Sequence, residues 1–105
     1  MIVTGKTLVY GILGDPIQHS LSPVMQNAAF EALGIDAVYV PFHVVPEQLG
    51  RAVAGLKALQ VQGVNVTVPH KEAVCAYLDR LDEDAALIGA VNTIVCDGED
   101  YIGFN

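Results

Sequence analysis

Short apolar runs alternate with segments of helical spacing along the first two thirds of the sequence, and this alternation limits the fold more than any other feature. Residues 8–13 (LVYGIL) form such a run, which ends at the turn formers of residues 14–16 (GDP). Two further valine-rich runs, 37–45 and 63–68, have the composition of strands. Strands separated by helices pair in parallel, because a parallel connection must cross back over the sheet. The pattern predicts an α/β fold.

The two intervening segments carry helix signals. Ser22 suits an N-cap and Pro23 suits the first helical position; apolar residues then recur at helical spacing until Gly34 provides a stop. Residues 49–59 repeat leucine, alanine and valine at the same spacing after Pro46. Each segment can therefore serve as the crossover between two parallel strands.

The last third of the chain predicts shorter elements. We expect a helix that opens at Pro69 and runs to residue 78, a short acidic helix over 82–88, and strands over 91–96 and 101–104 joined around Asp97-Gly98, a hairpin signal. The acidic run 79–84 is interpreted as a solvated helix face. The predicted fold is a single domain over residues 1–105, with a mostly parallel, mixed sheet of about five to six strands flanked by helices and a C-terminal hairpin.

Charge and composition argue against two classes of partner. The formal charge is −7 and only five residues are Lys or Arg, so nucleic-acid binding is not expected. No apolar run approaches the ~20 residues that span a bilayer, and the start lacks a signal-peptide pattern, which favours a cytoplasmic protein without membrane contact. Cys75 and Cys96 have no metal-ligand spacing, so we expect free or buried thiols and no metal.

Two serines flank one residue at the entrance of the first predicted helix, in the segment 19–23 (HSLSP). In an extended segment, the hydroxyls of Ser20 and Ser22 would point to the same side, next to the unpaired N–H groups and the positive dipole end of the helix. That arrangement suits a carboxylate. Ordinary capping by Ser22, with Ser20 solvated, is the alternative.

Polar side chains also interrupt the third predicted strand, in the segment 65–71 (NVTVPHK). Asn65 and Thr67 share one face of the strand, where two polar groups in an otherwise apolar element indicate a polar site. Pro69 ends the strand and places Lys71 close to that end. A solvated surface lysine is the alternative for Lys71.

A third polar position is Asn92, which opens a strand directly after a helix in the segment 89–93 (GAVNT). Its amide can both donate to and accept from a hydroxyl. A capping or turn asparagine is an equally simple interpretation.

These segments together resemble the shikimate dehydrogenase family. HSLSP at 19–23, NVTVPHK at 65–71 and GAVNT at 89–93 occur in the order and at the separations of that family, and 103–105 (GFN) is similar to the opening of its GxNTD motif. The resemblance covers essentially the whole chain. It implies the family's N-terminal, substrate-binding domain.

The resemblance also assigns roles by position. It implies that Ser20 and Ser22 hold the shikimate carboxylate, while Asn65, Thr67 and Asn92 bond the ring hydroxyls. Lys71 matches the family's catalytic lysine, and Glu83 aligns with an acidic position sometimes assigned to cofactor contact. The implied reaction is the reversible reduction of 3-dehydroshikimate to shikimate with NADPH, in aromatic amino-acid biosynthesis.

The family's catalytic Asp would be the second residue after Asn105, and the segment 11–14 does not complete a GxGxxG dinucleotide turn. The resemblance therefore places NADP binding in a C-terminal nucleotide-binding domain of the full-length protein. We expect these 105 residues alone to lack dehydrogenase activity.

Two alternatives stay open at the level of sequence. One is a stand-alone module that binds shikimate or quinate without catalysis. The other is a quinate/shikimate dehydrogenase, although serines at 20 and 22 fit the shikimate-type pattern.

Overall fold

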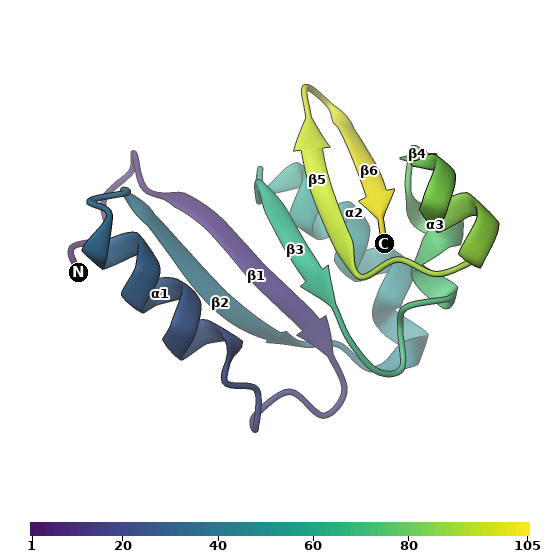
Figure 1. Ribbon diagram of the computed structural model, residues 1–105, viewed down its shortest axis with the longest axis horizontal. Helices are drawn as coiled ribbons and strands as arrows, with labels where there is room; N and C mark the ends of the chain where they lie inside the picture. The colour runs from purple at the N-terminus through teal and green to yellow at the C-terminus, as the bar shows by residue number, and fades with distance from the viewer.

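The computed structural model describes all 105 residues as one six-stranded mixed sheet with helices on both faces (Figure 1). In chain order, with η marking a 3₁₀ helix, the elements are β1 (Leu8–Gly14), α1 (Ser22–Ala32), β2 (Ala37–His43), η1 (Pro46–Gln48), α2 (Leu49–Ala58), β3 (Gly63–Val66), η2 (Ala73–Tyr77), β4 (Arg80–Leu81), α3 (Glu83–Ile88), β5 (Thr93–Asp97) and β6 (Asp100–Phe104). The predicted fold class is confirmed. None of the helices is both long and apolar enough to cross a membrane.

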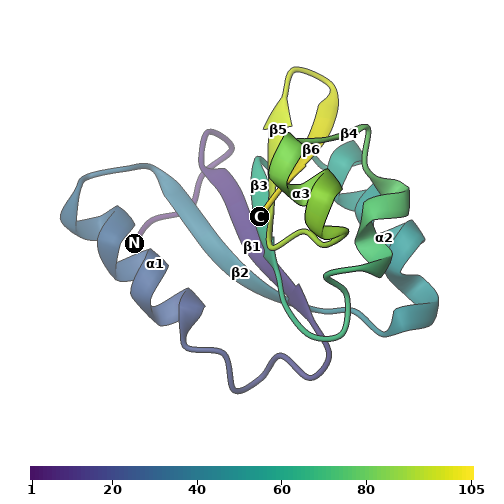
Figure 2. The same cartoon turned by 45° about the vertical axis from the view of Figure 1, so that its right-hand side comes forward.

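Strand β1 is the centre of the parallel half of the sheet, because it pairs with β2 on one side and with β3 on the other. The strand order is β2-β1-β3-β5-β6-β4, so the chain steps outward from β1 to β2 and then back across β1 to β3. Crossovers of this kind share one hand. The two steps run in opposite directions, so α1 and α2 lie on opposite faces of the sheet, as Figure 2 shows.

The antiparallel half is built on the predicted C-terminal hairpin. Strands β5 and β6 pair from Thr93 with Phe104 to Asp97 with Asp100, and β5 runs antiparallel to β3. Gly98 has a φ of 65° at the first central position of the turn, which is the pattern of a type II′ turn. The two-residue strand β4 pairs in parallel with β6 at the edge and was not predicted.

The two faces of the sheet are buried to very different extents. On the α2 face, 13 buried residues form one cluster, which includes Leu49, Val53 and Leu56 of α2. On the α1 face, the buried cluster has three members, Ile12, Ile17 and Tyr39, and no residue of α1 itself is buried. Hydrophobic burial therefore holds α2 to the sheet much more strongly than it holds α1.

The start of α1 differs from the prediction. Ser22 is the first helical residue rather than the N-cap, and Leu21 precedes it with a φ of −91° and a ψ of −6°, so the Ser20–Ser22 segment is not extended. The cause is local, because the Ser20 Oγ accepts a hydrogen bond from the Ser22 N–H at 3.2 Å and turns the chain one residue earlier. No side chain caps α1, so capping by Ser22 was a wrong interpretation.

The segment after Pro69 also differs from the prediction. The expected helix is replaced by the 3₁₀ helix η2, which ends where Leu78 becomes extended with a ψ of 153°. The acidic run 79–84 is not one helix face. Asp79 lies in a loop, and Asp82 is the N-cap of α3, where its carboxylate accepts a hydrogen bond from the Ala85 N–H at 2.8 Å.

Helices α1 and α2 end in the same backbone motif with different residues. Gly34, at a φ of 67°, donates to Glu31 O, and the next N–H donates to Phe30 O at 2.9 Å. Gln60 stands in the same position after α2 with a φ of 62°; Val61 N then donates to Leu56 O at 2.9 Å. Both ends are Schellman motifs, which favour glycine at the left-handed position. The backbone of Gln60 takes this left-handed conformation although its side chain makes the conformation unfavourable.

Replacing Gln60 by glycine should therefore stabilise the protein. Relief of the left-handed strain, less the added entropy of the unfolded chain, predicts an increase of about 0.5–1 kcal/mol in the free energy of unfolding. Urea unfolding measures it. Ala58→Gly, two residues earlier inside α2, is the matched control and should lower the same free energy by about 0.5–1 kcal/mol. A loss of stability in Gln60→Gly would contradict the strain argument.

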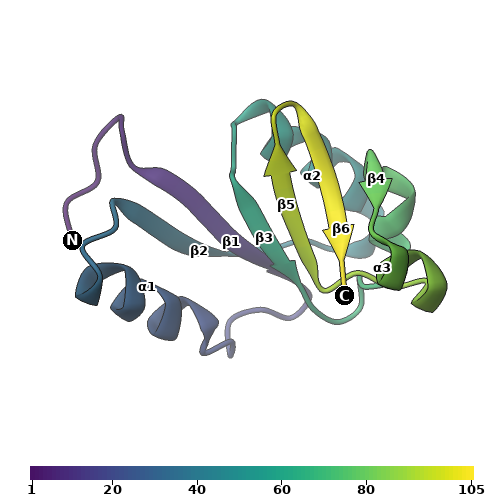
Figure 3. The ribbon, with the colours of Figure 1, turned by 45° about the horizontal axis from the view of Figure 1, so that its top comes forward.

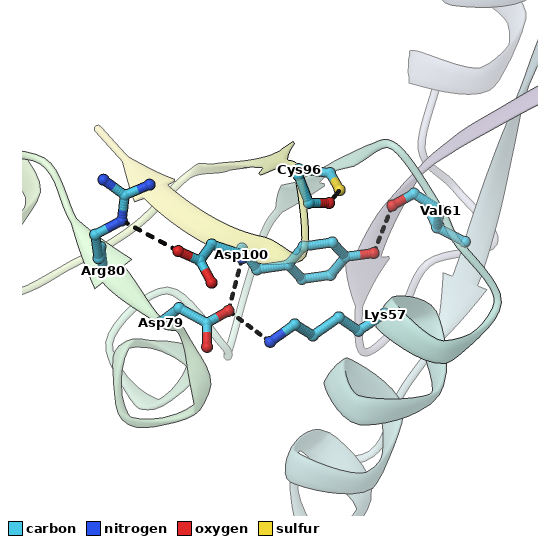
Figure 4. A network of polar contacts seen from close by, with 8 residues as sticks. Lys57, Val61, Asp79, Arg80, Cys96 and Asp100 are labelled. Carbon is cyan, nitrogen blue, oxygen red and sulfur yellow. Dashed lines mark hydrogen bonds and ion pairs between the residues drawn. The ribbon is translucent and has the colours of Figure 1, made fainter.

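Asp79 joins three elements through one carboxylate (Figure 4). Its Oδ2 accepts from Lys57 Nζ at 2.6 Å and from the Tyr101 N–H at 2.7 Å. The hydrogen bond from Lys57 is the main cause that lowers the pKa of Asp79, and the same bond raises the pKa of Lys57. Burial raises the pKa of the neighbouring Tyr101 hydroxyl to about 12, and this hydroxyl donates to Val61 O.

This pairing predicts a pH-dependent contribution to stability. Because the pKa of Asp79 in the folded state lies below its ordinary 3.8, the contribution is present above pH 3.8 and is lost as the pH falls through the lowered value. Asp79→Asn should therefore unfold at a lower temperature than the wild type at pH 7, with the difference shrinking below pH 3.8. Glu31→Gln, an exposed acid without an ion pair, should show no such trend. A gap in melting temperature that is constant with pH would rule out the charge as its cause.

Candidate functional site

The carboxyl ends of β1 and β3 form the point where the strand order reverses, and the loops that follow them leave toward opposite faces (Figure 3). In open α/β sheets, ligands bind in the crevice at such a point. Ser20 and Ser22 lie in the segment after β1, and Thr67 and Lys71 lie in the segment after β3. Topology therefore brings two of the three predicted polar segments to the carboxyl end of the parallel strands.

The third segment reaches the same end of the sheet because β5 runs antiparallel to β3. The start of β5 lies beside the end of β3, with Thr93 paired to Asn65. Asn92 comes one residue before the strand, and its carbonyl accepts from the Val66 N–H at 2.9 Å. The Lys71 carbonyl accepts from the Val91 N–H at 2.8 Å, so backbone bonds connect the second and third segments.

Thr67 is fixed by contact with β1. Its N–H donates to Leu13 O at 3.0 Å, just beyond the end of β3. Its methyl group lies so close to Gly14 that a Cβ added to this glycine would be 2.6 Å from Thr67 Cγ2. Gly14 is therefore needed for the close approach of the two strand ends.

Lys71 is exposed and makes no ion pair. The residue before it, His70, is 1% exposed, and its Nε2 donates to the Val44 carbonyl at 2.6 Å. A carbonyl oxygen can only accept, so this ring nitrogen carries a proton. His70 thus anchors the loop from inside and leaves the Lys71 ammonium directed to solvent, where it can meet a ligand.

A chain of side-chain hydrogen bonds runs through the site. The Tyr39 hydroxyl donates to Asn65 Oδ1 at 2.7 Å, and Asn65 Nδ2 donates to Thr93 Oγ1 at 3.3 Å. Thr93 then donates to Asn92 Oδ1 at 3.0 Å, and Asn92 Nδ2 donates to Asn105 Oδ1 at 3.5 Å. The two asparagines predicted from the sequence are therefore parts of one connected network.

Tyr39 was not among the site residues predicted from the sequence. Burial raises the pKa of the Tyr39 phenol, and the nearby Ser22 hydroxyl has a smaller opposite effect. Tyr39 thus lies between Ser22 and Asn65. No pattern in the sequence indicates these contacts, because Asn65 is 26 residues away from Tyr39 in the chain.

Glu83 is not part of this network. It is exposed in the first turn of α3, where a carboxylate complements the helix dipole. The alignment of Glu83 with a cofactor-contacting position stays a prediction.

Comparison with known proteins decides the family. Residues 12–94 match the family model described as the shikimate dehydrogenase substrate binding domain. The chain belongs to this family. It is 58% identical over its full 105 residues to a shikimate dehydrogenase (NADP(+)) of Geobacter metallireducens, and it spans 37% of that protein.

Solved structures of the shikimate dehydrogenase family have the same fold. One, a shikimate dehydrogenase in complex with NADP+, has a TM-score of 0.96 and 50% identity; the match covers 99% of this chain and 36% of that one. Another, from Listeria monocytogenes in complex with shikimate and NAD, has a TM-score of 0.94 and 44% identity; the match covers 97% and 35% of the two chains. The chain thus spans little more than a third of these relatives, as a substrate-binding domain does.

The contact between Gly14 and Thr67 generates a prediction for the site. Gly14→Ala places a methyl 2.6 Å from Thr67 Cγ2 and 3.0 Å from Ile17 Cδ1, so the strand ends must separate. Overpacking of this kind predicts a loss of about 1–3 kcal/mol in the free energy of unfolding, measured by urea titration. A Cβ at Gly5 would meet nothing within 4 Å, so Gly5→Ala should stay within about 0.5 kcal/mol of the wild type. Equal effects of the two variants would refute the contact's importance.

Proposed function

We propose that this domain binds shikimate and 3-dehydroshikimate for an NADP-dependent shikimate dehydrogenase, in the pathway to aromatic amino acids. The observation that carries the proposal is the convergence of the serine, Asn-Thr-Lys and Asn92 segments at one strand-reversal point. Family membership supports the same substrate. We assign the activity to the whole protein, to which these residues contribute the substrate-binding domain.

Shikimate offers one carboxylate and several hydroxyls, and the site has groups for both. Ser20 and Ser22 lie at the uncapped start of α1, where N–H groups and hydroxyls can donate to a carboxylate. Asn65, Thr67 and Asn92 provide amide and hydroxyl groups that donate to and accept from ring hydroxyls. We assign the carboxylate to the α1 side of the crevice and the ring hydroxyls to the β3–β5 side.

Lys71 is the proposed catalytic group of this domain. Oxidising an alcohol requires its proton to leave, so the site must stabilise negative charge on that oxygen and accept the proton. An exposed lysine is an ammonium ion at neutral pH. We assign Lys71 to polarising the reacting oxygen, with proton transfer shared with an acidic group from elsewhere in the protein.

The glycines of β1 do not have the packing of a dinucleotide turn. Gly11 and Gly14 are buried, and a Cβ on Gly11 would be 2.4 Å from Phe42 Cε2 and 2.5 Å from Val40 O. These glycines therefore permit close packing and do not form a cradle for a pyrophosphate. We assign NADP to a C-terminal nucleotide-binding domain of the full-length protein. The proposed compartment is the cytoplasm, in keeping with the free thiols of Cys75 and Cys96.

Calorimetric titration with shikimate, on the protein as the gene encodes it, tests the proposal together with the Lys71→Ala variant. The wild type should bind shikimate and oxidise it with NADP+. In Lys71→Ala, kcat should fall about 10²–10⁴-fold, because the oxyanion loses its cation. The dissociation constant for shikimate should change by less than about threefold.

Lys6→Ala is the control, because Lys6 is equally exposed but lies in the N-terminal turn. Its kcat and affinity should match the wild type. Parallel titration with quinate distinguishes a quinate/shikimate enzyme. Binding without turnover would indicate a binding module, and no heat from either compound would refute the proposed function.

A further inference from the structure

The orientation of the Asn65 amide is fixed by its neighbours. Asn65 Nδ2 lies 3.5 Å from the Asn92 carbonyl and 3.3 Å from Thr93 Oγ1. A backbone carbonyl can only accept, so the NH₂ group must face this side. Asn65 Oδ1 therefore points the other way, toward the Tyr39 hydroxyl at 2.7 Å.

Tyr39 must then be the donor in this contact, because a carbonyl oxygen has no proton to give. Tyr39 is 5% exposed, and burial raises the pKa of its phenol, so it keeps its proton at neutral pH. It is the only side chain hydrogen-bonded to Asn65 Oδ1. The rest of the network runs in the same sense: Thr93 Oγ1 accepts from Asn65 Nδ2 and donates to Asn92 Oδ1.

The position of Tyr39 is itself fixed. The Asn27 side chain accepts from the Tyr39 N–H and donates to the Tyr39 carbonyl, at 2.9 Å each. Asn27 belongs to α1, so the same helix that carries Ser22 also clamps the strand that carries Tyr39. The phenol reaches from the edge strand β2 across the α1 face of β1 to β3.

We propose that Tyr39 is a positioning residue for substrate recognition, whose hydroxyl holds the Asn65 amide with its oxygen toward Tyr39 and its NH₂ group toward Asn92 and Thr93. This inference rests on the proposed function, because the amide it orients is assigned to a ring hydroxyl of the substrate. Without the hydroxyl, Asn65 Oδ1 loses its donor, and only the longer contacts of Nδ2 with Asn92 and Thr93 hold the amide. The substrate then meets an amide that is held less firmly in the orientation it requires.

Tyr39→Phe removes the hydroxyl alone and keeps the buried ring. In the protein as the gene encodes it, the dissociation constant and KM for shikimate should rise about fivefold to tenfold, the range expected for one neutral hydrogen bond. The kcat at saturating shikimate should change by less than about twofold. Tyr10→Phe is the matched control, because the Tyr10 ring packs against Phe30 beside the same small apolar cluster and its hydroxyl makes no hydrogen bond. Its KM should equal that of the wild type.

A double-variant cycle separates positioning from a general structural effect. In an Asn65→Ala background, adding Tyr39→Phe should change the dissociation constant by less than about twofold, because the amide on which Tyr39 acts is gone. The Asn65 side-chain amide NMR signals of the free protein should shift in Tyr39→Phe and stay in place in Tyr10→Phe. Unchanged affinity and signals in Tyr39→Phe, or the same fold loss of affinity in both backgrounds, would overturn the inference. Absence of shikimate binding by the wild type would instead refute the proposed function.

Discussion

The shared pairing of β1 with β2 and β3 is the constraint on which the rest of the structure depends. Because both neighbours run parallel to β1 and lie on opposite sides of it, the two crossover connections must cover opposite faces. The loops after β1 and β3 then leave toward opposite faces. The polar residues predicted for the site lie on these loops, at the end of β3 or at the start of β5 through their place in this topology.

The domain is held together in two different ways on its two faces. The α2 face has a 13-residue apolar cluster, so packing is its main support, with the Lys57–Asp79 ion pair beside it. The α1 face has three buried residues and depends on directed hydrogen bonds, chiefly the Asn27 clamp on Tyr39. This division leaves polar groups on the α1 side available for recognition, because they are not surrounded by a close-packed core.

Local patterns predicted the elements well, and long-range contacts account for what they missed. Gly34 follows the end of α1 as predicted, because a glycine after a helical segment indicates a left-handed backbone position. Gln60 takes the same conformation after α2, but glutamine gives no such indication in the sequence. The run 79–84 was assigned to one helix face, but Asp79 pairs with Lys57, 22 residues away, and takes no part in a helix. Tyr39 was not predicted as a site residue for the same reason, because its partner Asn65 is 26 residues away in the chain. Asn65, Thr67 and Asn92 lie around the carboxyl end of β3, whereas Glu83 lies in α3 outside their network; the roles of the predicted site residues stay predictions.

The weak anchoring of α1 bears on how the domain responds to occupancy. Helix α1 carries Ser22 and clamps Tyr39, yet it buries no residue of its own. Regions with few buried contacts open at lower free energy than the core does. A carboxylate bound at its first turn would add its affinity to that small opening energy. The helix would then be the part of the domain that a bound acid tightens most, while the opposite layer stays rigid in either state.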